Sequence, residues 1–572
     1  MRNILRNHRL SRSLLALSVI GALSACNSSG GGDTNSSTPL PDTSYACQAN
    51  VMAQSNQLRT YQIMVESFVD GDASIGHGTG YGTSHHNGDL QGVIDSLDYI
   101  QDLGMNAIWL TPVFESEAIA GQEHWADRLD ATGYFATDYF TIDPRFGDLE
   151  TARTLVEEAH KRGLYVFFDG VFGHHKNGLI KPSPSGLSPS GLSPSGLSPS
   201  GLSPSGLSPS GLSPSGLSPS GLLPSGSSNP VDYPASLDFY KEVATYWIKE
   251  LKIDGWRLDQ AYQVPTDAWT QLRKAVDEAS QSVTYTNSKG EQVNPLGYMV
   301  AEIWKGESEI ANEAYGSNSD PALCSAFDFP MRYRIVETLA VNESGVGGRG
   351  AYWLDNGYST HNQYPTHAQP NLMIGNHDLV RFGDLLQRGN LADVNDAEYW
   401  LRHKAAFAFQ AAYTGPITLY YGDEIGDQVD GFAAKEDNST CAIQGLCDDH
   451  VARSSAKIEG VTATLDANQA DLKSYVTSLM TMRDAHPALY QGSRTNLVAS
   501  NGSYVDLKQS GSDKVLFALN TLESARSVTL TQESVGTGEL VDLLTNEKIT
   551  PSNGQYQILM SPLQGRFFAV KP

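Results

Sequence analysis

Three acidic residues and an arginine stand at or near the ends of short apolar runs, and together they could cleave a glycosidic bond. Arg257 and Asp259 close one run, Glu302 lies in another, and Asp378 ends a third. Residues two apart on a strand face the same side, so Arg257 can hold the Asp259 carboxylate ionised and oriented. Glycoside cleavage needs one carboxylate to attack carbon, one carboxyl to protonate the leaving oxygen, and anionic support for an oxocarbenium-like transition state. In a retaining enzyme two such carboxyls lie roughly 5–5.5 Å apart.

Two histidines and a fourth acid have the same setting. Asp169 lies in a run that His174 follows, and His377 directly precedes Asp378. Taken singly, each of these polar residues has an ordinary structural explanation, such as a helix cap or a buried ion pair. Their common position at the same end of successive runs is what indicates a shared site.

The apolar runs alternate with helix-like stretches, and this alternation predicts the fold. Eight runs are rich in Val, Ile, Tyr, Phe and Trp, and most are too short to be independent helices. They are 60–68, 106–114, 164–172, 253–259, 297–304, 325–331, 371–378 and 417–424. Helices are expected between them, for example over 93–103, 149–162, 237–251 and 399–413. Eight strands each followed by a helix predict a (β/α)8 TIM barrel with its site at the C-terminal strand ends; a doubly wound open sheet is the alternative.

After about His486 the pattern changes to short strand-like runs separated by Gly, Ser and Asn. These runs are 504–508, 514–520, 527–530, 556–560 and 565–570. The pattern predicts a C-terminal all-β sandwich over residues 487–572, following a catalytic barrel over 47–486.

A tandem repeat interrupts the barrel region after the third run. From Ser183 the unit Ser-Pro-Ser-Gly-Leu recurs as far as Leu222 and then decays by Ser227. Proline at every fifth position excludes helices and sheet ladders, and Gly and Ser keep a chain loose. The composition therefore predicts a disordered insertion over 183–227, which is either without function or a spacer or sugar-modified stalk.

The N-terminus has the features of an export signal. Four arginines precede an apolar run over 14–23 that is too short to span a bilayer, and Cys26 follows Leu-Ser-Ala. This predicts a lipoprotein signal peptide over 1–25, lipidation of Cys26 and a flexible tether over 26–46; an ordinary secretory signal is the alternative. Asn27 resembles the residue at this place in outer-membrane lipoproteins. We therefore expect an exported protein held by its lipid at the outer membrane, on a face that the sequence leaves open.

The net charge and the cysteine content limit which partners, disulfides and cofactors we expect. The formal net charge is −25, and it becomes −29 once residues 1–25 with their four arginines and no acid are removed. This argues against a nucleic-acid partner, because phosphates need a basic face. Of the four other cysteines, Cys441 and Cys447 close a short loop and are the favoured pair, which leaves Cys47 and Cys324 by elimination; free thiols stay open. The spacing shows no zinc pattern, no organic cofactor is expected, and the oligomeric state is left open.

The motifs at the strand ends resemble, in order, those of the α-amylase family, glycoside hydrolase family 13. Its four barrel motifs are matched by Asp169-Gly-Val-Phe-Gly-His174, Gly255-Trp-Arg257-Leu-Asp259, Val300-Ala-Glu302-Ile-Trp and Ile374-Gly-Asn376-His377-Asp378. Further matches include Tyr61-Gln-Ile, Asp143-Pro-Arg-Phe-Gly147 and Tyr420-Tyr-Gly-Asp-Glu424. The resemblance covers about residues 60–490.

This resemblance implies a retaining hydrolase of internal α-1,4 bonds in starch or maltodextrin. By motif, it implies Asp259 as nucleophile, Glu302 as general acid/base and Asp378 as the residue that stabilises the transition state and grips sugar hydroxyls. The residues it implies for substrate binding are Tyr134, His174, Arg257 and His377. Tyr134 would stack on the apolar face of the sugar, with packing at the barrel rim as the alternative.

Two departures from the family pattern affect the calcium site that the resemblance would otherwise imply. Typical α-amylases have a calcium-binding Asn where this chain has Gly173, and Tyr262-Gln263 replaces a common Lys-His pair. Both changes weaken the usual calcium site. The loop at Asp70 and Asp72 leaves a separate calcium site open, since oxygen-rich loops suit calcium; a solvated turn is the alternative.

The subclass also stays open. Phe135 stands where chain-end-cleaving members often carry Asp, which favours internal attack. The stretch Gly255–Gln263 is closer to neopullulanases and cyclomaltodextrinases, so pullulan, cyclodextrins, short maltodextrins and transfer to a sugar acceptor remain alternatives. A non-catalytic starch-binding lipoprotein is the alternative of another class, and the presence of all three carboxylates argues against it.

Overall fold

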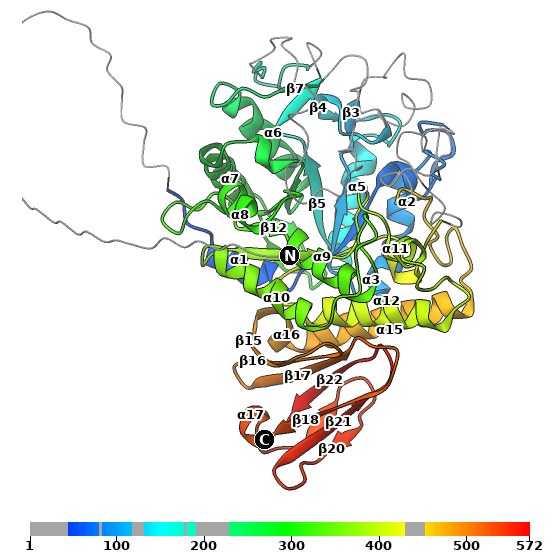
Figure 1. The fold of residues 1–572 in the computed structure, drawn as a ribbon. Helices are drawn as coiled ribbons and strands as arrows, with labels where there is room; N and C mark the ends of the chain where they lie inside the picture. The colour runs from blue at the N-terminus through cyan, green and yellow to red at the C-terminus, as the bar shows by residue number, and fades with distance from the viewer. Residues whose placement is uncertain are drawn as a thin grey trace, which may run out of the picture. The chain divides into compact units, whose positions relative to one another are not determined.

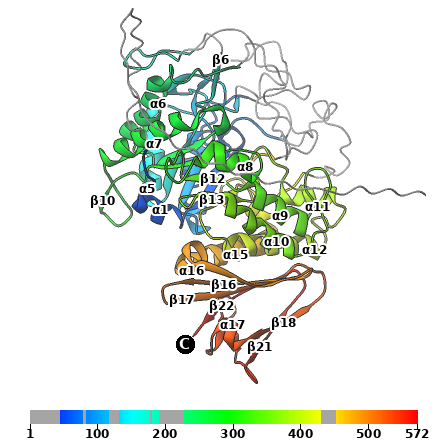
Figure 2. The same ribbon diagram turned by 60° about the vertical axis from the view of Figure 1, so that its left-hand side comes forward.

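The computed structural model describes residues 44–78, 83–116, 131–176, 180–189, 228–429 and 452–571. Within these ranges eight parallel strands follow one another around a closed barrel (Figures 1 and 2). They are β1 (Arg59–Ile63), β2 (Ala107–Leu110), β5 (Tyr165–Gly170), β8 (Gly255–Leu258), β11 (Tyr298–Ala301), β12 (Ser325–Phe327), β13 (Gln369–Met373) and β14 (Ile417–Tyr420). Pairing of Arg59 with Ile417 closes the ring. The predicted barrel is confirmed, and the open sheet is excluded because the barrel sheet has no edge.

Every predicted run begins close to an observed strand but extends past the strand's end. The run predicted over 60–68, for example, contains β1 and then the short helix η1 (Val65–Ser67). Residues beyond the strand ends, such as Phe68, Phe172 and Trp304, are as buried as the strands themselves. Apolar character therefore continues into the loops at the mouth of the barrel, and it does not mark where a strand stops.

The helices between the strands carry the capping signals expected from the sequence. Asp89 and Asp148 accept hydrogen bonds from the backbone amides of Gly92 and Thr151 at 2.7 and 2.8 Å. The helices are α5 (Leu149–Lys161), α6 (Leu237–Leu251), α7 (Thr266–Gln281), α8 (Glu307–Ile310), α9 (Phe329–Leu339), α10 (Tyr352–Thr360), α11 (Phe382–Arg388) and α12 (Ala397–Ala412). The helix predicted over 93–103 is instead two helices, α2 (Leu90–Asp95) and α3 (Leu97–Asp102). They break at Ser96, whose hydroxyl donates to the Gly92 carbonyl at 2.8 Å in competition with the backbone.

Short antiparallel pairs leave the barrel at the C-terminal ends of its strands. After β2, β3 (Phe114–Ser116) pairs with β4 (Ala136–Ile142), and after β5, β6 (His174–Lys176) pairs with β7 (Ser228–Pro230). These pairs lie near the top of Figure 1. A further pair, β9 (Tyr285–Thr286) with β10 (Gln292–Val293), lies between α7 and β11.

The first residues of the tandem repeat are part of the ordered surface. Ser183 is buried, and its amide donates to the Leu187 carbonyl at 2.8 Å. The amide of Ser185 donates to Glu242 on α6 at 3.1 Å. The prediction of disorder from Ser183 therefore does not hold for 183–189, because a helix face supplies hydrogen-bond partners that composition does not reveal. The same prediction for 190–227 lies outside the described residues.

The C-terminal β domain is confirmed as two packed antiparallel sheets after α15 (Ala467–Ala485) and α16 (Pro487–Gln491). The larger sheet has the order β15 (Ser493–Ala499), β16 (Ser503–Ser510), β17 (Asp513–Asn520), β22 (Gly565–Val570), β19 (Leu540–Asp542) and β20 (Lys548–Ile549). The smaller sheet pairs β18 (Arg526–Thr531) with β21 (Gln555–Met560), and α17 (Gln532–Val535) follows β18. Phe517 and Phe567 join the core shared with the barrel, whereas Leu516 and Ile558 belong to a separate core between the sheets. The domain lies below α15 and α16 in Figure 1.

The described N-terminal segment is tied to the barrel. A disulfide joins Cys47 to Cys324, which directly precedes β12, and Arg273 donates to the Ala46 carbonyl at 3.1 Å. The short helix α1 (Ala49–Ser55) follows. The pairing reached by elimination is thus confirmed, while Cys441, Cys447 and the lipidation prediction at Cys26 lie outside the described residues. Among the helices that are described, none has the length and apolar content of a membrane span.

Candidate active site

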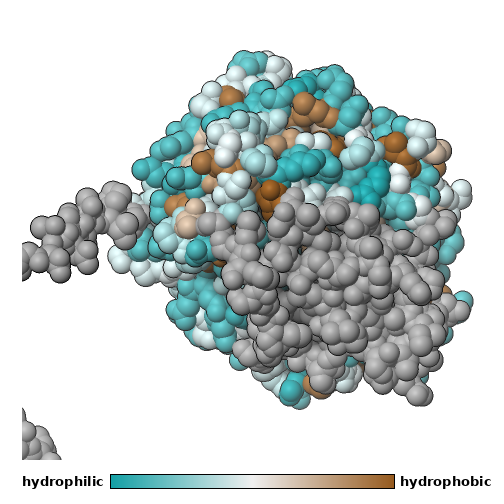
Figure 3. All heavy atoms as spheres, turned by 90° about the horizontal axis from the view of Figure 1, so that it is seen from above, coloured by the Kyte–Doolittle hydropathy of each residue, from teal (hydrophilic) through white to brown (hydrophobic). Residues whose placement is uncertain are grey.

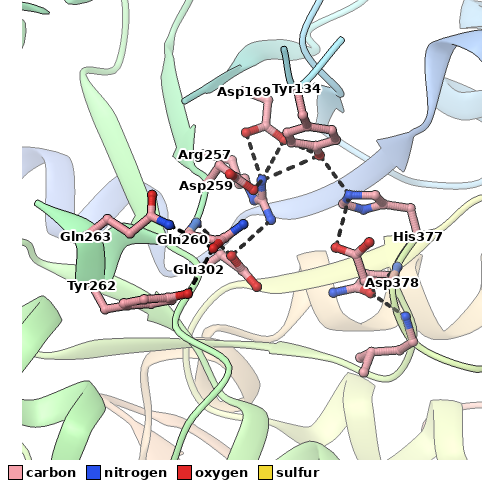
Figure 4. A network of polar contacts seen from close by, with 12 residues as sticks. Tyr134, Asp169, Arg257, Asp259, Gln260, Tyr262, Gln263, Glu302, His377 and Asp378 are labelled. Atoms are coloured by element: carbon pink, nitrogen blue, oxygen red, sulfur yellow. Dashed lines mark hydrogen bonds and ion pairs between the residues drawn. The ribbon is translucent and has the colours of Figure 1, made fainter. Parts of the chain in front are cut away.

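The strand ends bring the predicted catalytic residues to one place at the mouth of the barrel (Figure 4). They are Asp169 in β5, Arg257 in β8, Asp259 just after β8, Glu302 directly after β11, and His377 and Asp378 after β13. All of them are buried. Because the strands of a parallel barrel all point to the same end, residues far apart in sequence meet there.

Arg257 is the centre of this group. Its Nη1 donates to both carboxylate oxygens of Asp169 at 2.8 and 2.9 Å and to Oδ1 of Asp259 at 2.9 Å. Its Nη2 lies 3.5 Å from Oε2 of Glu302. One guanidinium therefore contacts both carboxyls of the predicted retaining pair, as Figure 4 shows.

The two carboxyls of the pair differ in their surroundings, and different neighbours shift the pKa of each. Burial raises the pKa of Glu302 to about 8; the negative charges of Asp259 and Asp378 add to this rise, and Arg257 opposes it. Burial also raises the pKa of Asp259, but Arg257 and His174 oppose the rise there. The closer hydrogen bond from Arg257 favours the ionised form of Asp259. A carboxyl with a strongly raised pKa beside one that accepts a hydrogen bond from a cation is the arrangement expected of a general acid and a nucleophile.

Tyr134 and His377 form a rigid pair beside the carboxylates. The hydroxyl of Tyr134 donates to Asp169 at 2.8 Å and lies 2.7 Å from Nε2 of His377. Gln62 Nε2 donates to Nδ1 of His377 at 2.7 Å, which assigns the ring proton to Nε2. Burial lowers the pKa of His377 to about 3, so the ring is neutral at ordinary pH. The two rings are parallel, with their centroids 5.4 Å apart.

Asp378 is held by a residue that the sequence pattern did not reveal. Arg453 Nη2 donates to Asp378 Oδ1 at 2.8 Å, and its Nε donates to the His377 carbonyl at 3.0 Å. Oδ1 of Asn376 accepts a hydrogen bond from the backbone amide of Asp378 at 2.8 Å. Arg453 belongs to no strand or helix, so periodicity could not indicate it. Gln62 could have been found, because it is a polar residue within a buried apolar run.

His174, the remaining predicted substrate-binding residue, begins β6. Its Nδ1 lies 2.9 Å from Oε1 of Gln263 in the loop after β8. The His174 ring is among the neighbours that lower the pKa of the Asp259 carboxyl. The structure thus places His174 beside the catalytic group from a second loop.

At both calcium locations considered from the sequence, the described side chains make contacts within the protein. Asp70 and Asp72 are exposed, and Asp72 Oδ1 accepts the amide and hydroxyl of Ser74 at 3.0 and 2.6 Å, which closes a turn. At the other location the Gln263 side chain fills the space beside Gly173. Within the ranges that the structure describes, no three His, Cys, Asp or Glu side chains gather so that they could hold a metal ion.

Comparison with known families agrees with this fold. The family model described as "Alpha amylase, catalytic domain" matches residues 62–179 and 235–460. The chain therefore belongs to the alpha-amylase family. It is 31% identical over 384 residues to a cyclomaltodextrinase of Thermoanaerobacter pseudethanolicus, an alignment that covers 64% of this chain and 57% of that relative. The chain thus spans little more than half the length of this relative. It is also 26% identical to neopullulanase 2 of Thermoactinomyces vulgaris, over 88% of this chain and 76% of the relative.

Solved structures give a stronger likeness. The chain is 59% identical to AmyP in complex with maltose, with a TM-score of 0.84, covering 92% of this chain and 98% of that one. A variant of AmyP in complex with maltotriose matches with 58% identity and the same TM-score, over 92% of this chain and 99% of that chain.

Proposed function

We propose that the chain is a retaining glycosidase that hydrolyses internal α-1,4-glucosidic bonds of starch-type α-glucans. The observation that carries this proposal is the shared contact of Arg257 with Asp259 and Glu302, together with the raised pKa of Glu302. The geometry places a guanidinium hydrogen bond on the nucleophile, and the raised pKa of Glu302 keeps the acid protonated at neutral pH. Family membership and the sugar complexes of AmyP support the same substrate class.

In the first step the Asp259 carboxylate attacks the anomeric carbon while Glu302 gives its proton to the leaving glycosidic oxygen. The carbon–oxygen bond to the departing sugar breaks, and a covalent glycosyl ester on Asp259 forms. Asp378, held by Arg453, offers its carboxylate to the sugar as positive charge develops. Arg257 keeps Asp259 oriented and ionised before the attack.

In the second step water replaces the departed sugar. Glu302, now ionised, takes a proton from that water, the water oxygen attacks the anomeric carbon, and the ester bond to Asp259 breaks. Glu302 is protonated again, and the configuration at carbon is retained after two inversions. A sugar hydroxyl in place of water would give transfer by the same route.

Three further side chains are assigned to sugar binding. The contacts of the Tyr134 hydroxyl with Asp169 and His377 fix the orientation of its ring, which can then stack on the apolar face of a glucose unit. The ring of His174 would hydrogen-bond a sugar hydroxyl, whereas the Nε2–H of His377 faces the Tyr134 hydroxyl and helps to orient that ring. Of the described residues seen from above, most are hydrophilic, and the hydrophobic ones are scattered rather than gathered in one patch (Figure 3). Such a surface suits a neutral, polyhydroxylated polymer.

Cyclodextrins and pullulan form the second candidate substrate class. It is favoured by similarity to two relatives, a cyclomaltodextrinase and a neopullulanase. The non-catalytic starch-binding alternative is disfavoured, because Asp259, Glu302 and Asp378 are all present in a formed site.

The test is a chromatogram of products from starch, pullulan and β-cyclodextrin, with and without an added acceptor sugar. Internal cleavage of starch predicts a ladder of maltooligosaccharides at early times. Faster consumption of β-cyclodextrin or pullulan would transfer the assignment to the second class, and products longer than the substrate would indicate transfer. Unchanged polysaccharide after long incubation with pure protein would contradict catalysis altogether.

The cellular setting belongs to the same proposal. We infer from the N-terminal sequence an exported protein with a lipid on Cys26, anchored at the outer membrane. Mass spectrometry of the mature N-terminus would show the acylated cysteine, and a Cys26→Ser variant would move to the soluble fraction.

A further inference from the structure

The loops that follow β5 and β8 interlock at Gly173 and Gln263. A β-carbon built on Gly173 would lie 2.4 Å from Cβ and 2.5 Å from Oε1 of Gln263. Both separations are far shorter than van der Waals contact, so Gly173 cannot carry a side chain while Gln263 keeps this position. The space left by one residue is filled by the other.

Gln263 is one member of a chain of neutral hydrogen bonds beside the catalytic acids (Figure 4). Its Nε2 donates to Oε1 of Gln260 at 2.9 Å, and the Tyr262 hydroxyl donates to the same oxygen at 2.8 Å. Its own Oε1 lies 2.9 Å from Nδ1 of His174. Because an amide oxygen can only accept, His174 donates through Nδ1.

The backbone of the same segment holds the general acid. Gln260 has a left-handed conformation, with φ of 40°, and its N–H donates to Oε2 of Glu302 at 2.8 Å. Few non-glycine residues adopt this conformation. The two hydrogen bonds that its side-chain oxygen accepts from Tyr262 and Gln263 stabilise it there. Residues 260–263 therefore connect Glu302 to His174.

A calcium ion does not fit this seam, defined as Gly173, His174, Gln260, Tyr262 and Gln263. The family resemblance places an asparagine ligand at the position of Gly173, where even a β-carbon has no room. The Gln263 oxygen already accepts from His174. The five residues of the seam contribute no carboxylate, whereas calcium takes about six to eight oxygen ligands and favours charged ones.

We propose that the Gln263 amide takes the place of a metal ion at the seam. It fixes the His174 ring against the loop of the nucleophile, and the enzyme needs no calcium there. Gln263 is a positioning residue that acts through His174. The inference rests on the proposed function for its kinetic readout, but its metal and stability readouts are independent of catalysis.

The first experiment compares the full-length protein with Gln263→Met, Gln263→Glu and the exposed control Gln281→Met. Methionine keeps the length and removes both hydrogen bonds, whereas glutamate keeps an acceptor for His174. We expect Gln263→Met to lower kcat/KM on maltodextrin roughly tenfold, the value of one lost hydrogen bond. Gln263→Glu should recover part of this loss, and the control should equal wild type. Melting temperatures should stay within about 2 °C, because one neutral hydrogen-bond pair contributes little to global stability.

The second experiment tests the interlock and the metal. Gly173→Ala alone should lower both the melting temperature and kcat/KM, and Gly173→Ala with Gln263→Gly should recover part of the melting temperature. Chelator treatment followed by addition of calcium should change neither readout in wild type. Elemental analysis should give the same calcium content for wild type and Gln263→Met.

Calcium that is present in wild type and lost in Gln263→Met would overturn the proposal. So would full activity of Gln263→Met, or a Gly173→Ala defect that Gln263→Gly does not relieve. If wild type cleaves no α-glucan, the proposed function fails. The seam would then still be judged by calcium content and by the paired melting temperatures.

Discussion

Two fully buried arginines have opposite surroundings. One is Arg257 at the mouth of the barrel, and the other is Arg483 at the end of the barrel that faces the β domain. Arg257 contacts three carboxylates, and these raise its pKa even though burial opposes the charge. Arg483 donates to the backbone carbonyls of Ala411, Tyr413 and Gly415, and burial lowers its pKa to about 9. Carbonyls cannot exchange protons, so the second arrangement can only join parts of the chain. Carboxylates can titrate and attack carbon, so the first can perform chemistry.

Lys508 extends the comparison. Its Nζ donates to the carbonyls of Ala412 and Leu489, and burial lowers its pKa well below the usual value. At the barrel end facing the β domain, buried Arg and Lys side chains therefore donate to fixed backbone oxygens, whereas at the mouth a guanidinium lies among titratable side chains. We expect substitutions in the first region to change stability and substitutions in the second to change turnover.

Glu302→Gln should have the largest effect. Loss of the proton donor should lower kcat on unactivated glucan by about 10³-fold or more, while Kd for maltotriose, measured by calorimetry, stays close to wild type. The exposed Glu278→Gln provides the matched control. Wild-type turnover by Glu302→Gln would remove this residue from the mechanism.

Arg483→Met should show the opposite pattern. The substitution leaves three buried carbonyls without their donor, which should lower the free energy of unfolding by about 3 kcal/mol. Urea unfolding followed by circular dichroism measures this, with the exposed Arg526→Met as control. The kcat/KM of the folded variant should stay within about twofold of wild type; a large kinetic loss at unchanged stability would contradict the division between the two regions.

Arg453→Gln tests whether Arg453, in the segment after residue 451, contributes to the active site. Removal of the charged hydrogen bond to Asp378 should lower kcat/KM roughly tenfold, or about 1.4 kcal/mol of transition-state stabilisation. Arg453→Lys should retain part of the activity, since it keeps the charge. Identical kinetics for wild type and Arg453→Gln would mean that Asp378 needs no support from this side.

The pH profile should reflect the raised pKa of Glu302. This carboxyl must be protonated to act as the acid, and its pKa of about 8 keeps it protonated up to that pH. We therefore expect kcat/KM to decline as pH rises through about 8, because the acid form is lost. An alkaline decline that begins near pH 5 would show that Glu302 has an ordinary acidity.

Deletion within the repeat should have the smallest effect. From its composition, removal of 190–227 should change the melting temperature by no more than about 1 °C. Extending the deletion to Ser183 also removes the hydrogen bonds of Ser185 with Glu242, which are exposed, and should cost about 0.5 kcal/mol at most. A larger fall for the shorter deletion would show that residues 190–227 pack on the barrel.

The sequence predicted the barrel because its eight apolar runs and capping residues Asp89 and Asp148 are local signals. The ends of the strands were harder to predict from sequence, since burial continues beyond them at Phe68 and Trp304. The break between α2 and α3 at Ser96 depends on one side-chain hydrogen bond, which leaves no periodic pattern in the sequence. Strand β15 was missed because it is only half-buried and its burial does not alternate clearly.

The sequence by itself determined the family, the eight-stranded barrel, the β domain and the identity of Asp259, Glu302 and Asp378 as candidates, because residue type and order are enough for motifs. Only the tertiary structure decided that Arg257 bridges the two acids, that Arg453 holds Asp378, and that Gln263 fills the space beside Gly173. The contacts of Arg453 and Gln263 join loops 75 and 89 residues apart in sequence, and the contact of Arg257 with Glu302 joins the ends of the paired strands β8 and β11. Such contacts follow from closure of the barrel, and no local pattern carries them.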